Sequence, residues 1–100
     1  MNQAGMKVTI NRKTYDTSTA VLLASNRYWD GNNFERGGRN TYLYRTAKGN
    51  YFRYTTTMWQ GEFDTITPID AEEAEELYNE LREKEVKYKD AFPDVTIEEA

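Results

Sequence analysis

The sequence predicts an α+β domain in which a small, mainly antiparallel sheet, with the element order ββ-α-βββ-α, is covered by a long C-terminal helix. Two observations carry this prediction. The segments 41–46 and 51–57 are rich in aromatic and β-branched residues and are separated by a short turn that contains a glycine. Beyond residue 74, apolar side chains recur at three- and four-residue steps, which is the spacing of an amphipathic helix.

The chain of 100 residues has room for one domain. We place this domain at residues 7–92, with a flexible lead at 1–6 and a tail at 93–100. The first residues lack the charged start and apolar run of a signal peptide, and no apolar run approaches the roughly 20 residues that span a bilayer. Since the chain also has no cysteine, we expect a cytoplasmic protein without membrane contact.

The N-terminal part predicts two short strands and a short helix. Lys7–Ile10 alternates in polarity like a strand, and the turn 11–13 leads into a second strand at Thr14 and Tyr15. Asp16 is a candidate helix N-cap, since its side chain can accept from free amide groups of a first turn. The residues that then follow at helical spacing predict a helix over 18–26; they are Ala20, Leu23 and Ala24.

The centre of the chain predicts a loop and then a β-hairpin. Residues 26–40 are rich in glycine and other turn formers. The hairpin joins 41–46 to 51–57 through Ala47–Asn50. Alternation puts Tyr42 and Tyr44 on one face of the first strand, and Leu43 and Arg45 on the other.

The C-terminal part predicts one strand and the long helix. The strand spans 62–67 and ends at Pro68. Asp70 opens a capping box with Glu73, and the helix is expected to run to about residue 88, a length of roughly 28 Å. Its apolar stripe is suited to covering a sheet and consists of Ala74, Leu77, Tyr78, Leu81 and Tyr88.

Composition argues against an enzyme. The chain contains neither histidine nor cysteine, so imidazole acid–base catalysis, thiolate nucleophiles and the usual zinc sites are excluded. The glycines match no phosphate-binding fingerprint. Carboxylates on neighbouring helix turns are possible cation ligands, but no second carboxylate cluster accompanies them. We therefore expect no catalytic residue, no metal and no cofactor.

The net charge of −4 conceals a strong asymmetry. Through Gln60 the chain carries nine basic residues against three acidic ones; from Gly61 onward it carries four against fourteen. A row of carboxylates on the predicted helix has the single-sign charge that fits a basic groove on a nucleic-acid-binding protein. Alternatively, these carboxylates form an ordinary solvated helix face without a partner. The row consists of Glu72, Glu73, Glu76, Glu80 and Glu83.

The glycine-rich loop supplies a second candidate for partner binding. Tryptophan, phenylalanine and arginine are enriched at interfaces, and the loop carries Trp29, Phe34, Arg36 and Arg39. Trp59 is either a further anchor or part of the core. An alternative function is nucleic-acid binding by the hairpin, whose aromatic side chains alternate with Arg45, Lys48 and Arg53. Direct nucleic-acid contact is not expected, because the acidic helix would repel the phosphates unless it lay on the far side.

Three segments carry a resemblance to a known group of proteins. The residues 7–20 contain Tyr-Asp-Thr-x-x-Ala, the residues 41–52 contain the hairpin motif, and 66–74 contain Ile-x-Pro-Ile followed by Glu-Glu-Ala. In these motifs the chain resembles small proteins from phages and mobile elements of Gram-positive bacteria, some of which are anti-CRISPR inhibitors. The resemblance implies a phage protein that acts in the host bacterial cell, binds a Cas effector complex and blocks target DNA binding or cleavage. It assigns no functional residue, and a homodimer is left open.

Overall fold

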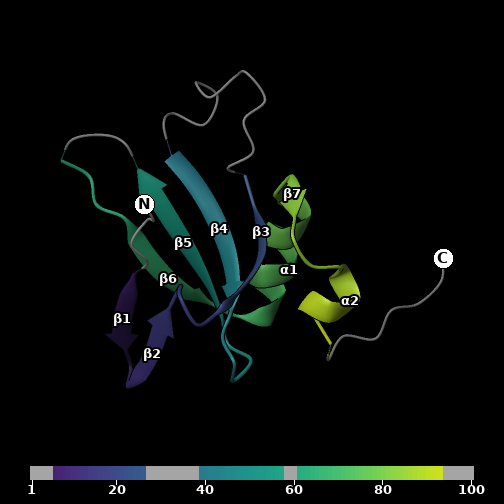
Figure 1. Cartoon of the computed structure of the whole chain (residues 1–100), viewed down its shortest axis with the longest axis horizontal. Coiled ribbons are helices and arrows are strands. Elements are labelled where there is room, and N and C mark those ends of the chain that lie inside the picture. The colour runs from purple at the N-terminus through teal and green to yellow at the C-terminus, as the bar shows by residue number, and fades with distance from the viewer. Residues whose placement is uncertain (1–5, 27–38, 58–60, 94–100) are drawn as a thin grey trace.

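A five-stranded antiparallel sheet dominates the computed structural model, which describes residues 6–26, 39–57 and 61–93 (Figure 1). The strands, in spatial order, are β6 (Thr65–Ile69), β5 (Tyr51–Thr57), β4 (Arg39–Arg45), β3 (Val21–Ser25) and β7 (Glu83–Lys84). A separate two-stranded hairpin is formed by β1 (Lys7–Ile10) and β2 (Lys13–Asp16). The helices are α1 (Ala71–Glu80) and α2 (Tyr88–Ala91). The predicted α+β class with a mainly antiparallel sheet is confirmed.

The central hairpin, β4–β5, is confirmed with the expected alternation. Its register pairs Tyr44 with Phe52 and Leu43 with Arg53, and Gly49 takes the positive φ of 90° that the turn needs. Leu43 is fully buried on one face of the sheet, whereas the ring of Tyr44 stacks on Phe52 on the other. Both faces of the hairpin therefore pack against other parts of the chain.

The predicted helix over 18–26 is wrong, because this segment forms strand β3. The side chain of Asp16 accepts from the backbone N–H of Ser18 at 2.9 Å and from its hydroxyl at 2.7 Å, which closes a turn rather than capping a helix. A register shift between Leu22 and Ala24 then places the consecutive residues Leu23 and Ala24 in the same core. The bulge thus puts two neighbouring apolar residues in one core, whereas Ala20 packs against the other cluster, so the three residues do not share one apolar face.

The predicted long C-terminal helix is also wrong, since α1 ends at Glu80 after ten residues. Leu81 is extended, with φ −78° and ψ 135°, and the chain turns back to form β7 and then α2. The turn brings Tyr88 and Phe92 onto the same core as Tyr78. The contacts of these rings with Tyr78 and with each other bury aromatic area, which favours the break.

The strand before α1 is shifted relative to its predicted position. It spans Thr65–Ile69 rather than 62–67, and it continues through Pro68. Because β6 is an edge strand, the missing N–H of proline is tolerated there. The predicted cap of α1 is confirmed: the side chain of Asp70 accepts from the backbone N–H of Glu73 at 2.8 Å.

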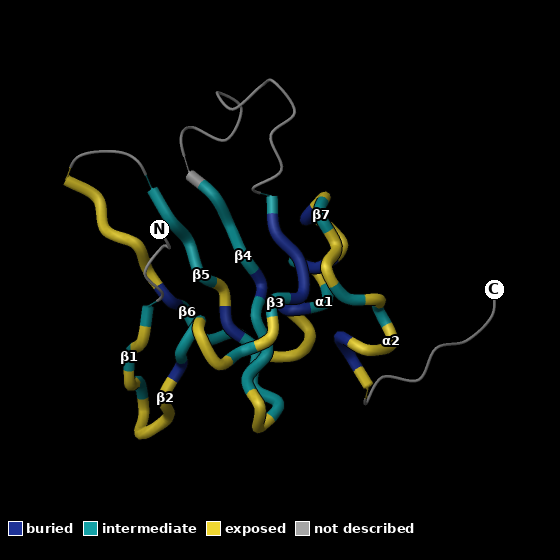
Figure 2. The backbone as a smooth tube through the Cα atoms, viewed as in Figure 1, coloured by how far each residue is buried: buried dark blue, intermediate teal, exposed yellow. Residues whose placement is uncertain are grey.

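Two hydrophobic clusters lie on opposite faces of the sheet. Figure 2 shows where buried residues fall along the backbone, for example along β3. The helices cover one face, and the buried members of that cluster are Leu23, Ala24, Leu43, Ala74, Tyr78, Leu81, Ala91 and Phe92. The β1–β2 hairpin covers part of the other, where the buried members are Tyr15, Phe52 and Ile66. Figure 1 shows β1 and β2 at the lower left of the sheet and the two helices at its right.

The start of the domain is held against the second cluster. The backbone N–H of Met6 donates to Thr17 Oγ1 at 2.8 Å, and the N–H of Thr17 donates to the Met6 carbonyl at 3.0 Å.

Among the helices that the structure describes, none combines the length and the apolar character needed to cross a membrane.

Candidate partner-binding surfaces

One face of α1 presents four exposed carboxylates. Apolar residues at helical spacing turn the opposite face into the core, where Ala74 and Tyr78 are buried. We call the exposed set the acidic helix face; it consists of Glu72, Glu73, Glu76 and Glu80. Glu75 does not belong to it, because this half-buried side chain accepts from the Tyr88 hydroxyl at 2.7 Å.

A small hollow of about 110 Å³ runs between α1 and the sheet, beside the acidic helix face. Its lining residues are Arg53, Ile69, Glu73, Glu76, Leu77 and Glu80. Arg53 brings one positive charge from β5 to three carboxylates, so the hollow keeps a negative charge. In the described ranges, no group of three or more carboxylates is arranged to hold a metal ion.

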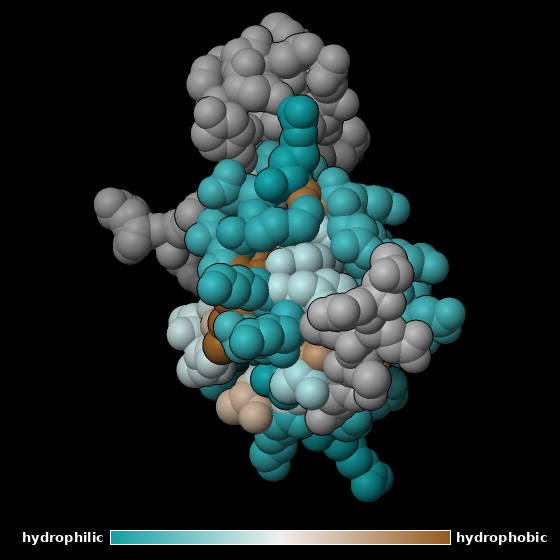
Figure 3. Space-filling view, turned by 90° about the vertical axis from the view of Figure 1, so that its right-hand side faces the viewer, coloured by the Kyte–Doolittle hydropathy of each residue, from teal (hydrophilic) through white to brown (hydrophobic). Residues whose placement is uncertain are grey.

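The surface around the helices is hydrophilic overall. Figure 3 views the molecule from the side on which α1 and α2 lie, and hydrophilic side chains dominate the surface that is visible there. Apolar side chains appear only as small separate patches. A partner that docks on the visible part of this side therefore meets mainly hydrophilic side chains.

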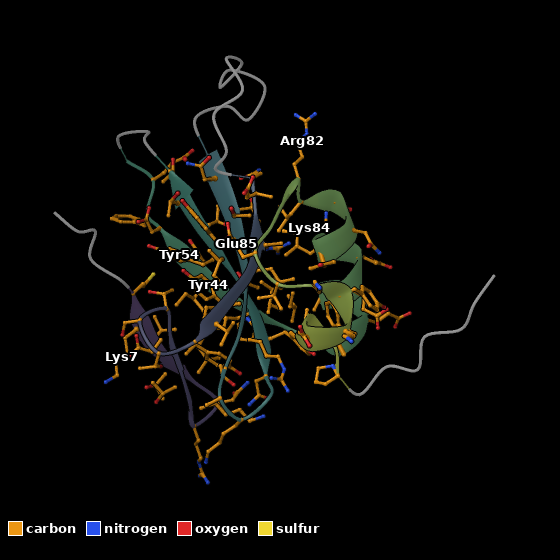
Figure 4. The ribbon with its side chains drawn as sticks, turned by 45° about the vertical axis from the view of Figure 1, so that its right-hand side comes forward. Lys7, Tyr44, Tyr54, Arg82, Lys84 and Glu85 are labelled. Carbon is orange, nitrogen blue, oxygen red and sulfur yellow. The ribbon has the colours of Figure 1, made fainter. Side chains whose placement is uncertain are left out.

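The aromatic and basic residues of the β4–β5 hairpin are separated by strand alternation. Tyr42 and Tyr54 have ring centroids 5.6 Å apart on the face that β1–β2 partly covers, and Tyr44 lies beside Tyr54 there (Figure 4). Arg45 and Arg53 alternate with these tyrosines and so belong to the face of the helices. Two further aromatics are used by the core: Phe52 is fully buried, and the Tyr51 hydroxyl donates to the Ala91 carbonyl at 3.1 Å.

Tyr54 is expected to make stability fall at alkaline pH. Burial raises the pKa of Tyr54, and the charge of Asp64, the neighbouring tyrosines and a hydrogen bond with Asp64 raise this pKa further. A raised pKa stabilises the fold below the unfolded value of about 10, and this contribution is lost as the pH rises through the folded pKa. Urea unfolding between about pH 8 and about pH 11 should therefore show a smaller fall in stability for Tyr54→Phe than for the parent chain.

Asp64→Asn provides the control for this prediction. It removes the second-largest cause of the raised pKa and leaves burial, the largest, in place. The alkaline fall should then be reduced only in part. An alkaline fall of the same size in Tyr54→Phe and in the parent chain would contradict the assignment.

A second hollow, of about 490 Å³, lies between the turn that joins β1 to β2 and the turn that joins β4 to β5. We call it the basic hollow; its lining residues are Arg12, Lys13, Thr14, Thr19, Thr46, Ala47, Lys48 and Asn50. Sequence reasoning missed the pairing of Arg12 and Lys13 with Lys48, because these residues are 35 or more positions apart in the chain. A local signal for the basic hollow is present in the sequence: arginine follows asparagine in a tight turn, at a position where glycine is usual.

The structure brings together four of the five helical glutamates singled out in the sequence. Glu83 is separated from them, because it lies half-buried in β7, paired with Ser25. Arg39 begins β4, where its backbone pairs with Thr57. The other predicted anchors lie outside the described residues; they are Trp29, Phe34, Arg36 and Trp59.

Comparison of the chain with protein families, with curated proteins and with solved structures finds no match. The surfaces described above are therefore the basis for a functional proposal.

Proposed function

We propose that this chain is a small, non-enzymatic inhibitor that binds a nucleic-acid-binding protein and occludes the surface on which that protein holds nucleic acid. The proposed partner is a Cas effector complex of a bacterial host, which makes the chain a phage anti-CRISPR protein acting in the host cytoplasm. The resemblance of its three sequence motifs to small phage proteins supports this choice of partner. The acidic helix face supports the mode of action.

The observation that carries the proposal is the charge of α1. Its ten residues, Ala71–Glu80, include five glutamates and no lysine or arginine. The glutamates in the first turn are favourable there, because they face the positive end of the helix dipole. Glu80 in the last turn faces the negative end, and no basic residue offsets it within that turn. Glu76 and Glu80 also repel each other at a spacing of four residues.

This unfavourable charge pattern suggests a use outside the chain. A helix selected for stability alone would carry lysine or arginine in its last turn, each worth about 0.3–1 kcal/mol. A row of four carboxylates that faces the single positive charge of Arg53 instead keeps a net negative field along one exposed edge of the molecule. Such a field attracts a basic groove, raises the rate of association and competes with the phosphates that the groove normally binds. Occlusion of that groove is the mechanism we propose.

The direct test is an assay of purified Cas effector complexes with and without the chain. The expected results are a stable complex, loss of target DNA binding or cleavage, and competition between the chain and target DNA. The affinity should decrease as salt is added, because the contact is electrostatic. Failure to bind any effector complex, or a bound chain that leaves DNA binding and cleavage unchanged, would remove the proposal.

A further inference from the structure

The basic hollow collects three positive charges from two turns that are distant in sequence. Arg12 and Lys13 come from the β1–β2 turn and Lys48 from the β4–β5 turn, and all three side chains are exposed. None of the described residues that line the hollow is acidic. The remaining polar lining residues offer hydroxyl or amide groups; they are Thr14, Thr19, Thr46 and Asn50. This is a set of donors suited to an anion.

The β1–β2 turn holds Arg12 in an unfavourable backbone conformation. The two residues of the turn have positive φ, 52° at Asn11 and 67° at Arg12. Asparagine tolerates this region, whereas arginine does so at a cost of about 1–2 kcal/mol, and glycine is the residue that such two-residue turns prefer. A cation therefore stands where folding alone would favour glycine.

The β4–β5 turn is held in place by its own hydrogen bonds. Backbone bonds join Thr46 N–H to the Asn50 carbonyl at 2.7 Å and Gly49 N–H to the Thr46 carbonyl at 2.9 Å. The hydroxyl of Thr46 accepts from the backbone N–H of Asn50 at 3.0 Å. The guanidinium of Arg45 lies under the same turn: a Cβ at Gly49 would be 3.6 Å from its terminal nitrogen. The turn at this end of the hairpin therefore has a backbone held by hydrogen bonds, and it carries positive charge.

The basic hollow and the helices belong to opposite faces of the sheet. Tyr15 of β2 packs on Phe52, whose cross-strand partner is Tyr44. Leu43, which alternates with Tyr44, packs in the cluster that contains Ala74 of α1. The β1–β2 hairpin and α1 are thus on different sides of the sheet, as Figure 1 shows. The sheet separates the acidic helix face from the basic hollow, which removes the main electrostatic objection to contact with phosphates.

We propose that the basic hollow binds the phosphodiester backbone of a nucleic acid. The lining residues include no aromatic ring, and Ala47 is the one apolar residue among those described. Nothing in this set stacks on a base or forms an apolar pocket for one, as a site for a free nucleotide does. Contacts of this kind position a strand without reading its sequence. The inference goes beyond the proposed function and does not depend on it.

The test measures fluorescence anisotropy of a labelled, mixed-sequence single-stranded DNA of about 16 nucleotides, a length at the upper end of known single-strand site sizes. Three phosphate contacts should give a slope of about −2 in a plot of log affinity against log salt concentration. A different sequence of the same length should bind with similar affinity. Absence of binding at low salt, or a slope near zero, would overturn the proposal.

A matched pair of double variants locates the site. Arg12→Glu with Lys48→Glu should reduce affinity at least tenfold and bring the salt slope to about −0.7. Lys87→Glu with Lys89→Glu is the control, because it changes the net charge by the same amount at two exposed positions beside and within α2. This control should leave the affinity within about twofold of that of the parent chain, since negative charge added far from the site is screened by salt. Equal losses in the two double variants would overturn the site.

Arg12→Gly separates a binding role from a structural one. Glycine relieves the positive φ, so this variant should unfold at a higher temperature than the parent chain. It should also bind the oligonucleotide severalfold more weakly, because one of three cations is gone. A higher melting temperature with unchanged affinity would show that Arg12 does not contact the strand.

Competition distinguishes the backbone from free phosphate. Unlabelled oligonucleotide should displace the probe, whereas inorganic triphosphate at the same phosphate concentration should displace it much less. Equal displacement by triphosphate would overturn the assignment to a phosphodiester chain. The outcome is also independent of effector inhibition, because Glu76→Lys with Glu80→Lys should not weaken oligonucleotide binding although it should weaken inhibition.

Discussion

Replacement of Phe52 by alanine is expected to lower the free energy of unfolding by about 4 kcal/mol. Phe52 has no exposed surface and lies where the five-stranded sheet meets the β1–β2 hairpin. Its ring contacts Tyr15 edge-on, at a centroid distance of 5.6 Å, and stacks on Tyr44 at 5.1 Å. Alanine would leave a cavity between them and remove the contact that seats Tyr15.

Urea unfolding monitored by circular dichroism measures this effect, and Phe63→Ala is the matched control. Phe63 is 85% exposed, so the same substitution there should change stability by less than about 0.5 kcal/mol. Similar losses for the two variants would contradict the placement of the β1–β2 hairpin on the sheet. Since proteins of this kind have a total stability of about 5–15 kcal/mol, a loss of this size removes between about a quarter and about four fifths of it.

Charge reversal on the acidic helix face is expected to abolish inhibition of the partner. Glu76→Lys with Glu80→Lys replaces two exposed carboxylates of α1 by cations and should weaken partner binding by a hundredfold or more, a loss of about 3 kcal/mol. The reason is that each lysine not only removes an attraction to the basic groove but adds a repulsion. Titration of the effector complex with each variant, followed by DNA cleavage, measures the loss.

The same variant should keep a stability within about 1 kcal/mol of the parent chain, although it places two lysines beside Arg53. Lysine at position 80 suits the negative end of the α1 dipole, and lysine at position 76 follows Glu72 at the favourable spacing of four residues. Loss of inhibition without loss of stability would therefore identify a contact and not a folding defect.

Glu85→Lys with Asp90→Lys is the matched control for net charge. Both side chains are exposed and lie outside α1, in the C-terminal segment that contains α2. This pair should retain most of the inhibition. If it abolished inhibition equally, the net charge of the chain and not the acidic helix face would determine binding.

The sequence correctly predicted the elements that are defined by residues close together in the chain. The β4–β5 hairpin follows from its aromatic and β-branched strands and from the turn at Gly49, and it was predicted within two residues. The N-cap at Asp70 depends on a bond that spans three residues, and it was predicted at the correct residue. The acidic helix face follows from helical spacing over two turns, and four of the five glutamates proposed from the sequence lie on it.

The wrong predictions concern segments whose conformation depends on distant partners. Residues 21–25 form a strand because β4 and β7 provide hydrogen-bonding edges on both sides, and this pairing overrides a helix-like spacing. Likewise, nothing near Glu80 in the sequence marks a helix end. Beyond the helix end, the chain turns back and packs the rings of Tyr88 and Phe92 on Tyr78, a contact that no local signal near Glu80 predicts.

The sequence by itself determined the hairpin, the cap of α1 and the division of charge between a basic first part and an acidic second part. Only the tertiary structure decided where these charges lie. Strand alternation puts Arg53 beside the acidic helix face and the tyrosines on the other side of the sheet. Packing of Tyr15 on Phe52 brings Arg12 to the turn of Lys48. A charge count depends on composition alone, whereas a charged surface depends on which distant segments are packed together.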